Sequence, residues 1–304
     1  MKLIPYKAKQ FLLVLAKVLI VGLAFFYIFN RLQNDNNLNF SAAFSCLSGF
    51  SIAFLLLFTI LNWFLEVIKW QNLVASFKTI TFYEAMQQTF GSLTAAIFTP
   101  NKVGEYGAKV LYFKRENAKR IVVLNFIHNS SQMLVTVLFG SIGVLVSGFK
   151  FPVSSLFWLS IGFVVVFVFI IFFRRIEIYG FSIQKLVEKV KNSDRKMLLK
   201  TLVLSIFRYF VFSTQFFILL LFFDVNMAFK TAFATIFTMY FLASIVPTIH
   251  FLDVVIKGSV AVFLFSNLGV SAHKIIAITS IMWLLNLVLP VVVGSFFVLR
   301  FKFK

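Results

Sequence analysis

The sequence contains long apolar segments, each about as long as a membrane is thick. A helix needs about twenty apolar residues to cross a hydrocarbon core of roughly 30 Å. Six segments meet this length: 11–29, 44–65, 121–147, 153–173, 201–223 and 275–299. With 61% hydrophobic and 13% charged residues, the chain has too much apolar surface for a water-soluble domain. The segments therefore predict an all-α, polytopic transmembrane helical bundle with six full spans.

The N-terminal segment is interpreted as a membrane span and not as a cleavable signal peptide. A basic start precedes it, as in a secretory signal. However, its apolar run is long for a signal peptide, and no small-x-small cleavage site follows it. We therefore expect one integral membrane domain over residues 1–304, with a first half (1–173) and a second half (201–304).

The basic residues predict the orientation of the spans. The formal net charge is +19, but the charges flank apolar spans, which is the positive-inside pattern and argues against nucleic-acid binding. The 174–200 linker carries eight Lys and Arg residues and should be cytoplasmic. Both termini and the basic segments 66–81 and 114–120 then lie in the cytoplasm as well. This distribution is typical of a multi-pass protein of the cell (inner) membrane.

A few basic residues remain inside the predicted membrane segments. Lys17 and Arg208 lie about two turns from the cytoplasmic ends of ordinary spans, so we expect their side chains to reach the interface. The others lie in two apolar but interrupted regions, 84–113 and 231–266. Broken backbone at membrane depth is tolerated only where protein or a water-filled cavity satisfies it. We therefore expect two broken or re-entrant helical hairpins.

The two interrupted regions share a design. Each has a proline near its middle, an acid five or six residues later, and a lysine four residues after the acid. The first series is Pro100, Glu105 and Lys109, and the second is Pro247, Asp253 and Lys257. Residues at i and i+4 share one face of a helix and can pair. Pairing lowers the cost of holding two charges at membrane depth, so we expect an ion pair in each hairpin.

The predicted topology makes the two hairpins enter from opposite sides of the membrane. The flanking spans are reversed too, so the halves form an inverted repeat, which in transporters places the substrate site near the midplane. A half-helix beginning near Gly104 would direct free N–H groups at an anion. Polar residues on one face of 121–147 would border that site, although hydrogen bonds between helices explain this face equally well. The predicted substrate-binding residues are Asn101, Lys102, Gly104, Glu105, Lys109, His128, Asn129, Gln132, His250, Asp253 and Lys257.

Two motifs carry a resemblance to a known family. The run from Trp70 to Leu73, and Pro100-x3-Gly104-Glu105 followed by a basic residue, resemble the lysylphosphatidylglycerol synthase transmembrane-region family, whose members are often described as flippase-like. The resemblance covers nearly the whole chain and implies a multi-span bundle that moves or presents a lipid headgroup. Because the chain stops at RFKFK after the last predicted span, we expect no soluble synthetase domain and no synthesis of lysyl-lipid.

The leading functional hypothesis is translocation of an anionic phospholipid or lipid-linked saccharide headgroup through a polar cavity between the hairpins. The alternative is a non-catalytic membrane subunit that docks a separate lipid-modifying or glycosyl-transferring enzyme. Either a second copy of the chain or such an enzyme could be a partner. An intramembrane transferase ranks last, because no nucleophile–base pair is located. With one cysteine, three scattered histidines and no Walker-type loop, we expect no metal, no cofactor and no enzymatic activity.

Overall fold

The computed structural model describes residues 48–99, 102–147, 183–246 and 248–301. These residues form helices joined by short segments, which confirms the all-α prediction for the described part of the chain. In chain order the elements are α3 (Gly49–Val74), α4 (Phe82–Ala96), α5 (Val103–Val110), η1 (Arg115–Asn117), α6 (Ala118–Ser147), α8 (Ile183–Lys191), α9 (Arg195–Phe222), α10 (Phe229–Ile245), η2 (His250–Leu252), α11 (Asp253–Ser266), α12 (Ala272–Trp283), η3 (Leu284–Val288) and α13 (Leu289–Leu299).

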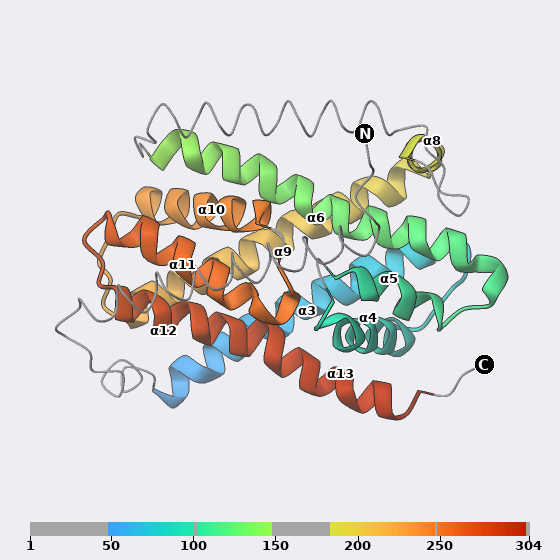
Figure 1. Ribbon diagram of the computed structural model, residues 1–304, viewed down its shortest axis with the longest axis horizontal. Helices are drawn as coiled ribbons and strands as arrows, with labels where there is room; N and C mark the ends of the chain where they lie inside the picture. Colours follow the sequence, from blue (N-terminus) through green and yellow to red (C-terminus); the bar gives the residue numbers. More distant parts are fainter. Residues whose placement is uncertain (1–47, 100–101, 148–182, 247, 302–304) are drawn as a thin grey trace, which may run out of the picture.

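Four helical segments among the described residues are long and apolar enough to cross a membrane. They are α3, the η1–α6 segment, α9, and the continuous α12–η3–α13 segment. All four correspond to predicted spans, and they run along the length of the molecule (Figure 1). The predicted spans 11–29 and 153–173 lie outside the described residues, so the total of six stays a prediction.

Each interrupted region forms a pair of helices that are shorter than a span. The first pair is α4 with 15 residues and α5 with 8, and the second is α10 with 17 and α11 with 14. The first pair is connected at both ends to α3 and α6, and the second to α9 and α12. This arrangement confirms that both regions are broken helices. Pro100 and Pro247 lie outside the described residues, and the inverted-repeat relation of the two halves stays a prediction.

The tips of the two hairpins meet. The backbone N–H of Phe251 in the second hairpin donates to the carbonyl oxygen of Ile97 in the first, at 3.1 Å. The rings of Phe98 and Phe251 lie 5.9 Å apart between centroids. The indole N–H of Trp283 donates to the carbonyl of Phe251 at 3.2 Å, so α12 supports the same contact. The two hairpins therefore form one continuous structure with the adjacent span.

Helix α3 extends further than the sequence analysis predicted. The predicted span ended at residue 65, but the helix continues to Val74. Trp63 and Trp70, one heptad apart, both face the core. Glu66 and Lys69, which the sequence analysis placed beyond the end of the span, therefore lie inside the helix and are only 7% and 1% exposed. The prediction was wrong because it ended the span at the first charges, which are paired within the bundle.

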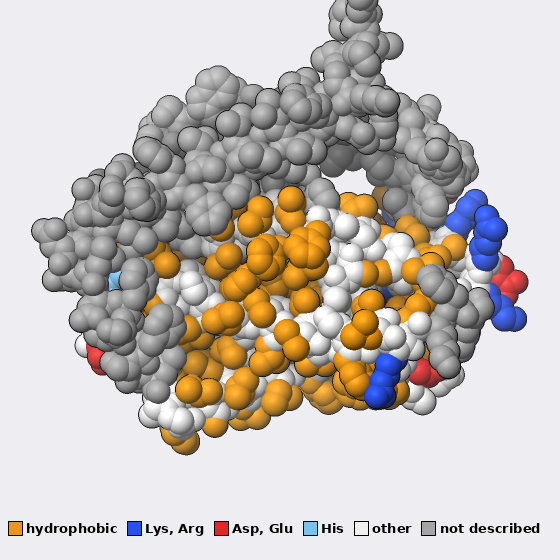
Figure 2. Space-filling view, turned by 60° about the horizontal axis from the view of Figure 1, so that its bottom comes forward, with side chains coloured by type: hydrophobic (Ala, Val, Ile, Leu, Met, Phe, Trp, Pro, Cys, Tyr) orange, Lys and Arg blue, Asp and Glu red, His pale blue; other side chains and the backbone are white. Residues whose placement is uncertain are grey.

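Apolar side chains form both the interior and the outer surface. One large core cluster is centred on α9 to α12 and includes Phe216 and Phe265, and another joins α3, α4 and α6 through Leu93 and Ile127. Large apolar side chains such as that of Leu138 are also exposed, and Figure 2 shows that they cover much of one face. A surface of this kind is suited to contact with lipid chains.

Basic side chains gather at one end of the described bundle. This basic end is where α3 stops and where α6 and α9 begin, at the right of Figures 1 and 2. It includes the basic residues of segments 114–120 and 189–200. The 174–200 linker was predicted as a connection, but α8 and the first turns of α9 occupy its described part. Its first nine residues, 174–182, lie outside the described residues.

The contact between α4 and α13 is especially close at Gly294. The Thr94 hydroxyl donates to the carbonyl of Val291 at 3.1 Å and brings the two backbones together. A Cβ atom on Gly294 would overlap the Thr94 hydroxyl and the carbonyl oxygen of Phe90. Because that carbonyl belongs to a helix backbone, it cannot move aside as a flexible side chain would.

We expect Gly294→Ala to destabilise the protein by about 1–3 kcal/mol through overpacking. Thermal unfolding of the detergent-solubilised protein measures the loss. Gly107→Ala is the matched control, because a Cβ at Gly107 in α5 meets nothing within 4 Å. The control should unfold at the same or a higher temperature, since Ala is favoured over Gly in helices. If Gly294→Ala and Gly107→Ala unfold at the same temperature, the close α4–α13 contact is contradicted.

Candidate functional site

A cavity of about 530 Å³ lies between the second hairpin and the spanning helices. Its walls come from α3, α6, α9, α10, α11 and the α12–η3 segment, and Lys102 reaches it from the first hairpin. Lysine and arginine side chains line it together with acidic ones and several aromatic rings. The charged residues are Glu66, Lys102, Arg208, Asp253 and Lys257.

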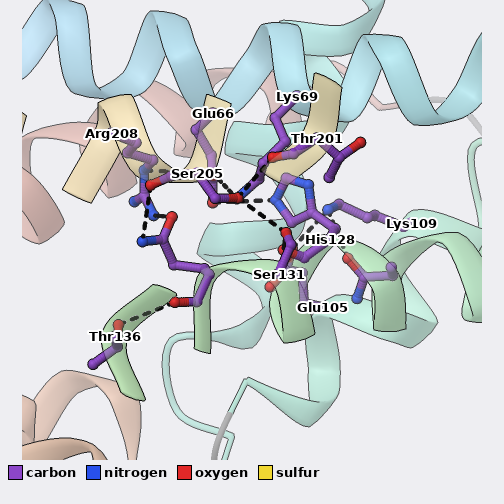
Figure 3. A network of polar contacts seen from close by, with 12 residues as sticks. Glu66, Lys69, Glu105, Lys109, His128, Ser131, Thr136, Thr201, Ser205 and Arg208 are labelled. Atoms are coloured by element: carbon purple, nitrogen blue, oxygen red, sulfur yellow. Dashed lines mark hydrogen bonds and ion pairs between the residues drawn. The ribbon is translucent and has the colours of Figure 1, made fainter. Parts of the chain in front are cut away.

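Glu66 is the centre of a buried polar network at one wall of the cavity (Figure 3). Its Oε2 atom lies 2.7 Å from the Lys69 ammonium. Its Oε1 atom lies 3.1 Å from Nε2 of His128, and Oε2 lies 3.4 Å from Nε of Arg208. The three partners come from α3, α6 and α9, so one carboxylate connects three helices. Such pairing is required, because a lone carboxylate in an apolar interior costs several kcal/mol.

Arg208 points into the bundle and not toward the interface. Its Nη1 donates to Oε1 of Gln132 at 3.2 Å, in addition to the contact with Glu66. The guanidinium carbon lies 5.8 Å from the ring centroid of Trp63. The side chain is only 13% exposed. The expectation that Arg208 extends to the membrane surface is therefore wrong, since its charge is satisfied by partners on α3 and α6.

The predicted pair Glu105–Lys109 is confirmed, at 2.7 Å between Nζ and Oε1. The ammonium also donates to Oδ1 of Asn125 at 2.8 Å and lies 3.9 Å from the ring centroid of Trp70. Lys109 is completely buried, and neither residue of the pair lines the cavity. In the structure this pair joins the first hairpin to α3 and α6, as Figure 3 shows beside the Glu66 network.

Lys102 is the N-cap residue of α5 and has a conformation that is unusual for a lysine. Its φ angle of 58° lies in the left-handed region, which costs a non-glycine residue about 1–2 kcal/mol. The hydroxyl of Thr99 accepts a hydrogen bond from the N–H of Gly104 at 3.0 Å, and a Cβ on Gly104 would crowd Thr99 and the backbone of Ala96. This tight turn places Lys102 at the cavity. Among the described residues, no carboxylate lies within ion-pair distance of its ammonium.

The second hairpin contributes Asp253 and its partners. The hydroxyl of Thr248 donates to Oδ1 of Asp253, and Oδ2 lies 3.0 Å from Nδ1 of His250. The predicted pair with Lys257 is present at 3.6 Å, but the lysine side chain is 43% exposed. The two hairpins therefore carry the same pair in different surroundings, since the first is enclosed and the second borders the cavity.

The wall formed by the α12–η3 segment contains a π-helical turn. Asn286 lies in this turn, η3, and lines the cavity. Its amide nitrogen donates to Gln215 at 2.8 Å, and its amide oxygen accepts from Asn62 at 2.8 Å. This chain of amides connects α3, α9 and η3 across the bundle.

The predicted site residues divide into three groups. Six of them line the cavity: Lys102, Asn129, Gln132, His250, Asp253 and Lys257. Four do not line it: Gly104, Glu105, Lys109 and His128. Asn101 lies outside the described residues. Within the described ranges, no three His, Cys, Asp or Glu side chains come together as a metal-binding group.

Sequence reasoning missed Glu66, Lys69 and Arg208 as members of the site. A usable signal was present, because Glu66 and Lys69 are spaced i, i+3 between Trp63 and Trp70. An ion pair at this spacing, flanked by large apolar residues one heptad apart, indicates a helix that continues with its charges turned inward.

Comparison with known protein families gives a match over most of the chain. The family model described as the lysylphosphatidylglycerol synthase TM region matches residues 14–294. No curated protein matches the chain. The family match covers all of the cavity-lining residues and both hairpins.

Removing one member of the enclosed pair should be far more damaging than removing both. We expect Lys109→Met to destabilise the protein by about 3–5 kcal/mol, because it leaves Glu105 buried without its cation. The double variant Glu105→Gln/Lys109→Met should recover a large part of this loss, because it leaves no buried charge without a partner. Thermal unfolding in detergent provides the measurement. Lys257→Met, on the exposed pair, should change stability by less than about 1 kcal/mol. Glu105→Gln alone completes the cycle, and a double-variant loss equal to the sum of the two single losses would contradict the pair's structural role.

Proposed function

Because the chain belongs to the lysylphosphatidylglycerol synthase TM region family, whose members are membrane proteins related to lipid modification or translocation, we propose that it binds and translocates an anionic lipid headgroup. The headgroup, of a phospholipid or a lipid-linked saccharide, would enter the 530 Å³ cavity. The proposed role consists of binding and movement, without bond chemistry. By the positive-inside rule we place the basic end on the cytoplasmic side.

The observation that carries the proposal is the ammonium of Lys102, which has no carboxylate partner among the described residues and shares the cavity with the guanidinium of Arg208. Both side chains line the cavity, and Glu66, the acid nearest to Arg208, already contacts Lys69 and His128. Positive charge therefore exceeds negative charge around the cavity. A phosphate can satisfy both cations at once, because charge-assisted hydrogen bonds to phosphate oxygens are strong and arginine can bind them in a bidentate manner.

The shape and outer surface of the protein support a lipid as the ligand. The cavity volume falls within the range of small-molecule sites, which suits a headgroup but not two acyl chains. Its walls also include Phe212, Tyr240 and Met239, which can pack against glycerol or sugar carbons. The acyl chains would remain outside, against the exposed apolar side chains of the spans (Figure 2).

The charges suggest how the ligand would be held and released. In the proposed cycle the phosphate replaces Glu66 as the partner of Arg208, while Lys69 and His128 continue to hold the carboxylate. Asp253 and Lys257 would exchange partners in the same way on the second hairpin. The exchange keeps every buried charge compensated, which avoids a cost of several kcal/mol at membrane depth.

We expect Lys102→Met to slow transbilayer movement of phosphatidylglycerol in proteoliposomes by about 10- to 100-fold. This factor corresponds to the free energy of one lost hydrogen bond between charged groups. Labelled lipid is placed in one leaflet and its appearance in the other is followed over time. Lys102→Arg keeps the charge and should retain most of the activity. Lys230→Met is the matched control, because Lys230 is exposed and remote from the cavity.

Two outcomes would contradict translocation through this cavity. In one, Lys102→Met and Lys230→Met move lipid at the same rate. In the other, the wild-type protein moves lipid no faster than protein-free vesicles do. The second outcome would favour the alternative role, in which the protein docks a separate lipid-modifying or glycosyl-transferring enzyme.

A further inference from the structure

A second cavity lies at the basic end, separate from the cavity described above. Its volume is about 700 Å³, and the end of α3, the start of α6, α8 and the start of α9 enclose it. The amide of Asn72 donates to the carbonyl of Met197 at 3.1 Å and ties α3 to α9. The guanidinium of Arg120 donates to the carbonyl of Ser76 at 2.9 Å and ties α6 to α3. The walls of this cavity are therefore fixed by hydrogen bonds between spanning helices.

The lining of this second cavity is strongly basic. Its charged residues are Arg120, Lys189, Lys196, Lys200 and Asp194. The acid is already engaged, because the side chain of Asp194 accepts a hydrogen bond from the N–H of Lys196 at 3.0 Å and caps α9. Among the described residues, no carboxylate lies within ion-pair distance of the three lysines. The cavity therefore presents a positive surplus to an anion.

The face of α9 that borders the cavity continues as an apolar stripe. Two lysines and two apolar residues lie on this face, at spacings i, i+4, i+7 and i+11 along the helix: Lys196, Lys200, Val203 and Phe207. Val203 and Phe207 are 39% and 59% exposed, although both are apolar. Cations at the helix end followed by exposed apolar residues deeper in the span match a phospholipid, with its phosphate at the interface and its acyl chain below.

Helix α8 supports a position at the membrane boundary. Val190 packs against the core cluster of α3, α4 and α6, whereas Val187 is 46% exposed beside it. The same short helix carries Lys189, which lines the cavity. A helix with exposed apolar and basic residues at the end of spanning helices is typical of the interfacial region.

We propose that this second cavity binds the phosphate-bearing headgroup of an anionic phospholipid from the leaflet at the basic end. Lys196 and Lys200 contact the phosphate, and one acyl chain lies along Val203 and Phe207. The site is independent of the proposed translocation, because it shares no lining residue with the first cavity. It holds a lipid at the interface, and does not move one across the membrane.

Binding of phosphatidylglycerol to the purified, delipidated full-length protein tests the proposal, with native mass spectrometry to count bound lipids. We expect Lys196→Gln/Lys200→Gln to weaken binding by on the order of thirtyfold, from about 1 kcal/mol for each interfacial cation. The matched control is Lys191→Gln/Arg195→Gln, which removes two charges from the same end but none from the cavity lining. The control should weaken binding by less than about threefold. If both double variants weaken lipid binding equally, binding depends only on the total positive charge of the basic end, and the proposal is overturned.

Two further arms separate the possible outcomes. Glycerol 3-phosphate should not displace the lipid at equal concentration; if it does, the site takes a free anion and the lipid assignment is wrong. The loss caused by Lys196→Gln/Lys200→Gln should be the same in the wild type and in a Lys102→Met background, because the two cavities share no lining residue, so the two proposals can fail separately. If the double variant does not fold, as judged by thermal unfolding, Lys189→Gln on α8 should still weaken binding by about fivefold, and no change would overturn the proposal.

Discussion

The buried carboxylate of Glu66 is the interaction on which the bundle around the cavity depends. It needs several partners because a charge in an apolar interior is costly to leave unpaired. Lys69, His128 and Arg208 supply them from α3, α6 and α9, at distances of 2.7, 3.1 and 3.4 Å. The carboxylate therefore fixes how three helices approach one another. It also holds Arg208 at the cavity, so the charge available to a ligand depends on this acid.

Trp70 connects the Glu66 network to the first hairpin. Its ring lies 3.9 Å from the ammonium of Lys109 and packs edge-on to His128 at 5.9 Å between centroids. Its indole N–H donates to Gln88 on α4 at 2.8 Å. One fully buried aromatic side chain thus contacts both polar networks and the hairpin. The position of Lys102 at the cavity follows from this anchoring, because Lys102 directly precedes the short helix α5 that carries Lys109.

Much of the fold could be predicted from local patterns, whereas the long-range contacts at the centre of the site could not. Apolar length predicted four spans that the described residues contain, and proline with an i, i+4 pair predicted both broken helices. Glu66 and Arg208 were not predicted as site residues, because a prediction from hydropathy places charged side chains at the ends of spans. Their burial depends on partners more than fifty residues away in the sequence, such as His128 for Glu66 and Gln132 for Arg208. Only the folded chain brings these partners together.

The π-helical turn at Leu284–Val288 sets the rotational phase of the last span. A π turn contains an extra residue, and each residue of a helix advances the side chains by about 100°. Thr279 and Met282, before the turn, face the cavity, whereas Gly294, after it, meets α4. In a straight α-helix of the same sequence, Gly294 would be rotated about the helix axis by about 100° relative to Thr279 and Met282. Such a helix could direct Thr279 and Met282 at the cavity or pack Gly294 against α4, but it could not do both. The π turn therefore allows one helix to line the cavity and to contact α4 closely.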